Sequence, residues 1–214
     1  MALKKILAFF GAFNPPTVAH LDLAKLALDR AGFESVMFVP SKSAYIRGEQ
    51  HKDYAYSDFE RLEMLHAAAK LRPWMLVSDI ELRSERQPRT YDTLCRLREL
   101  GYAPSLLLGS DKLPELEKGW LHVNEIAKEF GIVCLCRGDD EGERMIREDA
   151  FLRTLSPYIR VLKTPVNMHN VSSTAVRRQL AASHAANETK LAVPKEVLRL
   201  AMRKMPIKEK KDET

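Results

Sequence analysis

Residues 5–20 read KILAFFGAFNPPTVAH, an apolar run followed by a glycine, a turn with two prolines and a helical start. The apolar run predicts a buried strand from Lys5 to Phe10, and Gly11 marks its carboxyl end, where an open parallel sheet binds ligands. A glycine there would let a phosphate approach the backbone. Thr17 and His20 are three residues apart, so both face the positive end of the helix dipole and its unpaired N–H groups. Together they predict a phosphate site, although alone His20 is more often a packed histidine and Thr17 a helix cap.

Five further apolar runs rich in branched side chains are separated by longer helical patterns. This alternation is typical of a parallel sheet covered by helices. The sequence therefore predicts a single α/β domain in which an open parallel sheet carries helices on both faces. The expected strands are Lys5 to Phe10, Ser35 to Val39, Met75 to Ser78, Ser105 to Leu108, Ile132 to Cys136 and Ile159 to Leu162.

Capping residues bound the expected helices. The first runs from Leu21 to a terminating Gly32, and the second begins at Ser57, where Glu60 completes a capping box. Thr90 is expected to cap the third. The remaining expectations are helices over Thr90 to Leu100, Leu121 to Phe130, Ser172 to Ala182 and Pro194 to Met205, with Gly138 to Asp149 as a charged surface loop leading into a helix.

The composition bounds the class of protein. Its 214 residues, 45% hydrophobic and 29% charged, are typical of a globular domain and exclude disordered, fibrous and disulfide-framework classes. Lys and Arg outnumber Asp and Glu by 34 to 29, which favours anionic ligands such as nucleotides or nucleic acid. Three cysteines indicate a reducing compartment, and Cys134 and Cys136 are expected to be a buried, inert pair. No stretch is apolar enough to cross a bilayer, so we expect a cytoplasmic protein with no membrane partner.

A second group of polar residues lies late in the chain, where residues 170–178 read NVSSTAVRR. Ser173 and Thr174 supply hydroxyls at a helix start and Arg177 follows one turn later, a set that can bind two phosphates. A well-capped helix with solvated arginines explains the same pattern equally well.

A third group follows the fourth strand, where residues 106–112 read LLLGSDK. Asp111, just after Gly109, could accept ribose hydroxyls, and Trp120 could stack on a base. Alone, Asp111 could equally cap a turn and Trp120 fill the core. The G-x-x-x-x-G-K-[ST], G-x-G-x-x-G, H-E-x-x-H and G-x-S-x-G motifs are absent from the sequence, which argues against P-loop, ordinary dinucleotide-binding, zincin and serine-hydrolase chemistry.

Taken together in their order along the chain, the three groups resemble the nucleotidyltransferases with the H-x-G-H type motif, most closely the nicotinate or nicotinamide mononucleotide adenylyltransferases. The family motifs G-x-F-[DN]-P-x-[HT]-x-x-H, G-x-D followed by tryptophan, and [IV]-S-[SA]-T-x-[IV]-R are each matched, and the similarity covers almost the whole chain. The resemblance implies a Rossmann-like nucleotidyltransferase domain over residues 1–205. The polar residues 206–214, with three lysines, are expected to form a disordered tail.

The resemblance also implies a reaction and a set of roles. A mononucleotide 5′-phosphate would attack the α-phosphorus of ATP in line, release pyrophosphate and form no covalent enzyme intermediate. Mg²⁺ bound to ATP would be the cofactor, with no metal ligands from the protein. The implied catalytic residues are His20, Thr17 and Arg177; those binding ATP are Gly11, Ala12, Phe13, Gly109, Asp111, Ser173 and Thr174; and those binding the mononucleotide are Arg47, Thr90 and Trp120.

Two departures from the family pattern bear on the acceptor. The family's P-P-H-[KR] reads Ala44 to Arg47 here, which keeps the cation but places Ile46 where the histidine stands, and its S-Y-T reads Pro88 to Thr90. Arg89 could pair with a nicotinate carboxylate and favour the acid, or could be exposed. Nicotinate mononucleotide is the leading acceptor; the amide, another phosphate acceptor and a silent nucleotide-binding protein are the alternatives. We expect no nucleic-acid partner because the basic residues are scattered. Whether the chain forms a homo-oligomer is left open.

Overall fold

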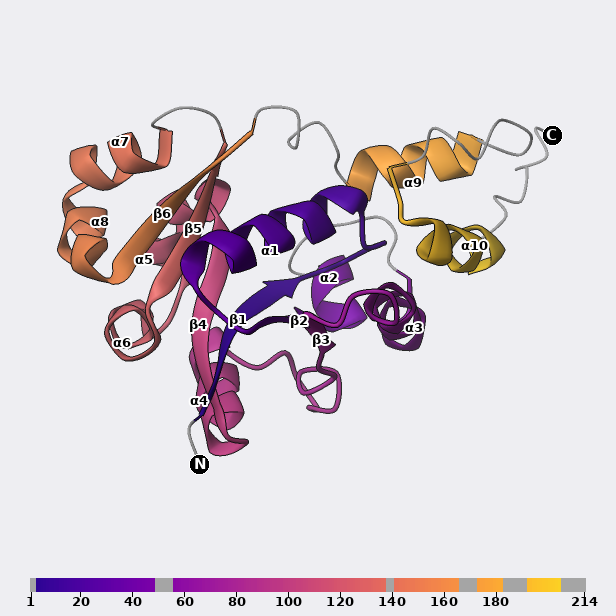
Figure 1. Cartoon of the computed structure of the whole chain (residues 1–214), viewed down its shortest axis with the longest axis horizontal. Coiled ribbons are helices and arrows are strands. Elements are labelled where there is room, and N and C mark those ends of the chain that lie inside the picture. Colours follow the sequence, from indigo (N-terminus) through magenta and orange to yellow (C-terminus); the bar gives the residue numbers. More distant parts are fainter. Residues whose placement is uncertain (1–2, 49–55, 138–140, 166–172, 183–191, 205–214) are drawn as a thin grey trace.

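The computed structural model describes residues 3–48, 56–137, 141–165, 173–182 and 192–204. Within these ranges the strands form one six-stranded sheet in the order β3-β2-β1-β4-β5-β6, and every neighbouring pair is parallel (Figure 1). All six expected strands are confirmed, with boundaries that differ by at most three residues. They are β1 (Lys4–Gly11), β2 (Ser35–Pro40), β3 (Met75–Val77), β4 (Tyr102–Gly109), β5 (Ile132–Arg137) and β6 (Ile159–Thr164).

Helices connect the strands and cover the sheet (Figure 1). Short 3-10 or π-helical turns extend some of them. The described helices are α1 (Val18–Ala31), α2 (Ser43–Gly48), α3 (Asp58–Ala69), α4 (Thr90–Glu99), α5 (Leu116–Gly119), α6 (Val123–Glu125), α7 (Glu141–Glu148), α8 (Ala150–Leu155), α9 (Ser173–Ala182) and α10 (Lys195–Lys204), with 3-10 turns at Ser110–Glu115 and Ser156–Tyr158 and a π-helical turn at Ile126–Phe130.

The core forms two layers, one on each face of the sheet. Successive strand residues point to opposite faces, so Leu7 of β1 packs with α1, α3, α9 and α10, whereas Ile6 and Ala8 pack with α4 to α8. Both layers are apolar, and the buried strand residues in them are mostly branched. The expectation of an open parallel sheet with helices on both faces is therefore confirmed.

The strand order reverses direction between β1 and β4. Strands β2 and β3 follow outward from β1, and β5 and β6 follow outward from β4. In open sheets of this kind, ligands bind outside the carboxyl ends of the strands at this switch point. Gly11 ends β1 and Gly109 ends β4, so two of the three polar groups found in the sequence begin there.

Local signals explain most helix boundaries, and four expectations need correction. Gly32 ends α1 in the left-handed conformation, and Ser57 with Glu60 forms the expected capping box. Thr90 is the first residue of α4 and not its cap, because Arg89 occupies the capping position without a side-chain bond. The described part of the charged stretch, residues 141–149, is mostly the helix α7, and residues 121–130 hold a helical segment that starts at Val123. The helices α2 and α5 were not expected, and the proposed tail over 206–214 lies outside the described residues.

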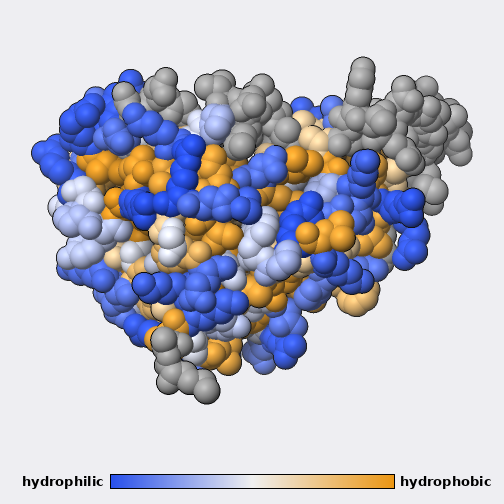
Figure 2. All heavy atoms as spheres, viewed as in Figure 1, coloured by the Kyte–Doolittle hydropathy of each residue, from blue (hydrophilic) through white to orange (hydrophobic). Residues whose placement is uncertain are grey.

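The thiols of Cys134 and Cys136 are buried with their Sγ atoms 3.8 Å apart on one face of β5, which confirms the expected buried pair. In the described ranges, no helix combines the length and apolarity needed to cross a membrane. Hydrophilic side chains cover much of the face seen in Figure 2, with apolar side chains between them.

Candidate functional site

Thr17 and His20 form one hydrogen-bonded unit at the start of α1. Thr17 is the N-cap: its hydroxyl accepts from the backbone N–H of His20 at 3.4 Å and lies 2.8 Å from Nδ1 of the imidazole. The backbone N–H of Thr17 donates to the same Nδ1 at 3.0 Å. Because Nδ1 accepts this bond, a neutral imidazole carries its proton on Nε2. The helix start therefore fixes both the orientation of the ring and the atom that can donate a proton or a hydrogen bond.

Thr17 itself is 0% exposed, and its hydroxyl and backbone N–H both interact with His20. The side chain therefore orients the imidazole, and its direct contact with a phosphate stays a prediction. Half-buried His20 also packs against the ring of Phe13, with centroids 5.3 Å apart, and against Phe9 at 6.3 Å.

The space beside Gly11 is filled by the protein itself. A Cβ at this position would lie 3.1 Å from the Phe13 ring, which is 1% exposed. The glycine thus makes room for the ring that supports His20, and the approach of a phosphate to its backbone stays a prediction. Phe13 would contact ATP only through its backbone, and the Ala12 carbonyl already accepts from Arg61 at 2.8 Å.

The start of α9 meets the loop after β1. Ser173 Oγ donates to the carbonyl of Pro15 at 3.1 Å, and Arg177 Nη1 donates to the carbonyl of Asn14 at 2.8 Å. Arg177 Nη2 also donates to Thr174 Oγ1 at 3.3 Å. Residues about 160 positions apart in the chain therefore form one cluster, which brings the helix starts of α1 and α9 together.

Buried Arg61 joins three segments at this edge of the sheet. Its guanidinium donates to the carbonyls of Tyr56 at 3.2 Å and Ala12 at 2.8 Å, to the carbonyl of Ser41, and to the carboxylate of Asp58 at 2.7 Å. Burial lowers the pKa of Arg61, and the Asp58 carboxylate acts in the opposite direction. Local sequence patterns do not predict this role, because the partners are mostly backbone carbonyls that only the fold brings together.

At the end of β4, Gly109 and Asp111 fit together. A Cβ on Gly109 would lie 2.4 Å from Asp111 Oδ1, so only glycine lets this exposed carboxylate fold back toward the strand end. Its position at the switch point is suited to accepting ribose hydroxyls, as the sequence predicts.

The three residues expected on the acceptor side lie on separate elements. Arg47 is exposed on α2, next to buried Ile46; Thr90 begins α4; and half-buried Trp120 follows α5 and packs on the core. Arg89 is exposed. Within the described part of the chain, contacts join Thr17 to His20, hold α9 against the loop before α1 and place Asp111 beside Gly109. No such contact in the ranges that the structure describes brings the three acceptor-side residues together.

A buried polar network lies between β3 and α4, and no local sequence pattern predicts it. Glu81 is 2% exposed and accepts hydrogen bonds from Gln87 Nε2 and, at 3.0 Å, from Thr93 Oγ1. Burial without a cation raises the pKa of Glu81 from 4.5 to about 7, although its two hydrogen bonds act in the opposite direction.

This raised pKa makes stability depend on pH. Between pH 4.5 and about 7, the folded protein holds a proton on Glu81 that the unfolded chain has lost, so the free energy of unfolding falls as pH rises and levels off above about 7. The free energy of unfolding should fall between about pH 5 and about pH 8, and we expect Glu81→Gln to make this fall smaller by about 1 to 3 kcal/mol. One pKa unit corresponds to about 1.4 kcal/mol. Urea unfolding at both pH values measures this, with the exposed Glu85→Gln as control. If the free energy of unfolding differed between the two pH values as much in Glu81→Gln as in the parent, Glu81 would not be the group responsible.

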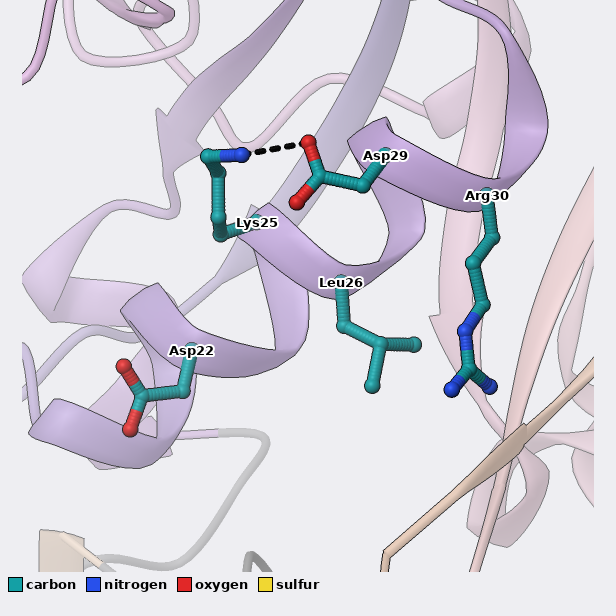
Figure 3. Close-up of a pocket in the computed structure, with 5 residues that line it drawn as sticks. All are labelled: Asp22, Lys25, Leu26, Asp29 and Arg30. Atoms are coloured by element: carbon teal, nitrogen blue, oxygen red, sulfur yellow. Dashed lines mark hydrogen bonds and ion pairs between the residues drawn. The ribbon is translucent and has the colours of Figure 1, made fainter.

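The clearest hollows in the described structure lie elsewhere. One is on the outer face of α1, lined by Asp22, Lys25, Leu26, Asp29 and Arg30, where Lys25 pairs with Asp29 (Figure 3). The other lies by the amino ends of β1 and β4. Neither contains a residue of the three sequence motifs. No three His, Cys, Asp or Glu side chains among the described residues gather where they could hold a metal ion.

Comparison with known proteins agrees with this architecture. Residues 8–179 match the cytidylyltransferase-like family. The chain is 34% identical over 186 residues to a protein of Neisseria meningitidis serogroup C, covering 84% of this chain and 89% of that protein, and 30% identical over 183 residues to one of Carboxydothermus hydrogenoformans, covering 84% and 88%. Both relatives are named as probable nicotinate-nucleotide adenylyltransferases.

A solved structure shares the fold. The nicotinic acid mononucleotide adenylyltransferase of Plasmodium falciparum, solved with APC and with NaAD, superposes with a TM-score of 0.71 at 19% identity, covering 94% of this chain and 95% of that one. The family match and the two relatives each span most of the chain. The chain therefore belongs to the cytidylyltransferase-like family and, within it, to the nicotinate-nucleotide adenylyltransferases.

Proposed function

We propose that this chain transfers the adenylyl group of ATP to nicotinate mononucleotide through the cluster formed by the starts of α1 and α9. The observation that carries the proposal is the pair of hydrogen bonds from Ser173 and Arg177 to the carbonyls of Pro15 and Asn14. These bonds hold the start of α9 against the loop between β1 and α1, which leads directly to Thr17 and His20. A triphosphate needs helix starts and polar side chains of this kind, because it carries several negative charges over a short length.

His20 is the group assigned to the reacting phosphate. Its Nδ1 is held by Thr17, so Nε2–H is the atom that donates toward oxygens on the α-phosphorus as charge develops there. Thr17 acts through the imidazole as a positioning residue. Adenylyl transfer needs no nucleophilic side chain, since the 5′-phosphate of the acceptor is the nucleophile.

The α9 residues are assigned to the leaving pyrophosphate. Ser173, Thr174 and Arg177 stand in the first turns of α9, where N–H groups and the helix dipole favour negative charge. Arg177 donates to the Asn14 carbonyl and to the Thr174 hydroxyl, which orients the guanidinium at the start of α9.

The remaining residues divide between the two nucleosides. Asp111 beside Gly109 suits the ribose of ATP, with the backbone from Gly11 to Phe13 nearby, whereas Trp120, Thr90 and Arg47 are assigned to the mononucleotide. Magnesium would arrive bound to the phosphates of ATP, because Mg²⁺ usually binds to substrate phosphates and water with few protein carboxylates. The cytoplasmic location stays a prediction.

The acceptor assay tests this function directly. The protein is incubated with MgATP and with nicotinate mononucleotide or its amide, and pyrophosphate release is measured. We expect turnover with the acid to exceed turnover with the amide at least tenfold. Preference for the amide or for another phosphate acceptor would correct the substrate, and no turnover with any acceptor would favour a silent nucleotide-binding protein.

Two neighbouring arginines provide a matched control for the site. Arg177 is half-buried against the loop after β1, whereas Arg178 is exposed on α9. Arg177→Met should weaken ATP binding in calorimetry at least tenfold at both low and high salt, because a lost guanidinium contact is local. Arg178→Met should change the affinity less than twofold. Equal affinities of both variants would remove Arg177 from the site.

A further inference from the structure

The segment that joins β3 to α4, residues 78–89, runs through turns with neither helix nor strand (the β3–α4 segment). It ends at Arg89 and leads into Thr90, the residue assigned above to the mononucleotide. An irregular connection of this length holds a defined position only if side chains or backbone groups elsewhere fix it.

Lys42 ties the β3–α4 segment to the end of β2. Its Nζ donates to the carbonyls of Leu82 at 2.9 Å and Ser84 at 2.6 Å. Its backbone N–H donates to Gln87 Oε1 at 2.8 Å. A single residue just after β2 therefore holds the segment at three points.

Glu81 continues this connection into α4. Gln87 donates through Nε2 to one oxygen of the Glu81 carboxyl, and Thr93 of α4 donates to the other at 3.0 Å. Burying a carboxyl away from any cation is unfavourable, as the raised pKa of Glu81 reflects. Its value here is that one carboxyl group accepts from donors on two segments, Gln87 before α4 and Thr93 within it.

We propose that Glu81 is a positioning residue for the acceptor: through Gln87 and Thr93 it fixes the start of α4 relative to Lys42 and the end of β2, and so determines how tightly the mononucleotide binds. The proposal rests on the assignment of Thr90 to the acceptor. Within the described part of the chain, the contacts of Glu81, Gln87 and Lys42 reach neither the α1–α9 cluster nor Asp111. The effect is therefore specific to the acceptor.

Steady-state kinetics with MgATP and nicotinate mononucleotide test the proposal. We expect Glu81→Ala to raise the KM for the mononucleotide at least tenfold and to change the KM for ATP less than twofold. Glu81→Gln should keep both KM values within threefold of the parent. Its amide oxygen can accept from Gln87, and its NH₂ can donate to Thr93, whose hydroxyl can turn to the Arg89 carbonyl 3.3 Å away.

Gln87→Met is the second variant, in case Glu81→Ala fails to fold. It keeps the length of the side chain and removes both amide contacts. We therefore expect it to raise the KM for the mononucleotide as Glu81→Ala does, and to change the KM for ATP less than twofold. Glu85→Gln, at an exposed position in the same segment, is the control and should leave both KM values unchanged. An equal rise in both KM values, or no rise in either, overturns the proposal.

Amide hydrogen exchange separates this proposal from the proposed function, because it needs no turnover. Exchange over residues 82–90 should be at least tenfold faster in Glu81→Ala than in the parent and in Glu81→Gln. Unchanged exchange would show that Glu81 does not hold the segment, even if the enzyme is active. Faster exchange in a chain that turns over no acceptor would support the positioning role and contradict the proposed reaction.

Discussion

His20→Ala is expected to lower kcat for adenylyl transfer by about 10²- to 10³-fold, the range found when one donor to a developing negative charge is removed. Nδ1 of the imidazole accepts from the backbone of Thr17, so Nε2–H is oriented before substrate binds. The loss should therefore fall mainly on kcat and much less on the KM for ATP. Thermal unfolding should change little, because His20 is only half-buried.

Two variants make this prediction specific. Thr17→Val keeps the β-branched shape but removes the hydroxyl 2.8 Å from Nδ1, and we expect a smaller loss of about tenfold in kcat together with about 1 kcal/mol of stability from the lost N-cap. His66→Ala, at an exposed position in the last turn of α3, should leave kcat unchanged. If His20→Ala retained more than a tenth of the parent kcat, the imidazole would not be the group that stabilises the transition state.

Sequence patterns predicted the parts of this fold that depend on local signals. The apolar runs located all six strands, and Gly32, Ser57 and Glu60 located helix ends through the backbone conformations and hydrogen bonds they favour. The spacing of Thr17 and His20 correctly placed both at the start of α1 on one face. Such signals are readable because the interacting groups lie within one turn of each other.

Other features depend on packing that local patterns do not predict. Thr17 is buried where the loop after β1 meets α1, and the Phe13 ring lies where a Cβ on Gly11 would point. The burial of Glu81 and Arg61 could not be predicted either, since charged residues are usually exposed and only tertiary contacts explain it.

Arg61→Met is expected to lower the free energy of unfolding by about 3 to 5 kcal/mol, the cost typical of breaking a buried charged group away from its partners. The guanidinium is 0% exposed and serves the carbonyls of Ala12, Ser41 and Tyr56 together with the Asp58 carboxylate. Methionine fills much of the volume but donates no hydrogen bond, so these acceptors would lose the bonds that Arg61 supplies. Urea unfolding at neutral pH measures the change.

Lys25→Met provides the matched control, because Lys25 is an exposed cation paired with Asp29 on α1 and its loss should cost less than about 1 kcal/mol. Arg61→Lys should recover only a small part of the stability. An ammonium group donates from a single atom, whereas the guanidinium donates from three nitrogens to four acceptors on three segments. If Arg61→Lys matched the parent, charge alone would account for the role. A large loss in both variants would instead mean that the shape of the guanidinium joins the ends of β1 and β2 to α3, and that the position of the His20 loop depends on this connection.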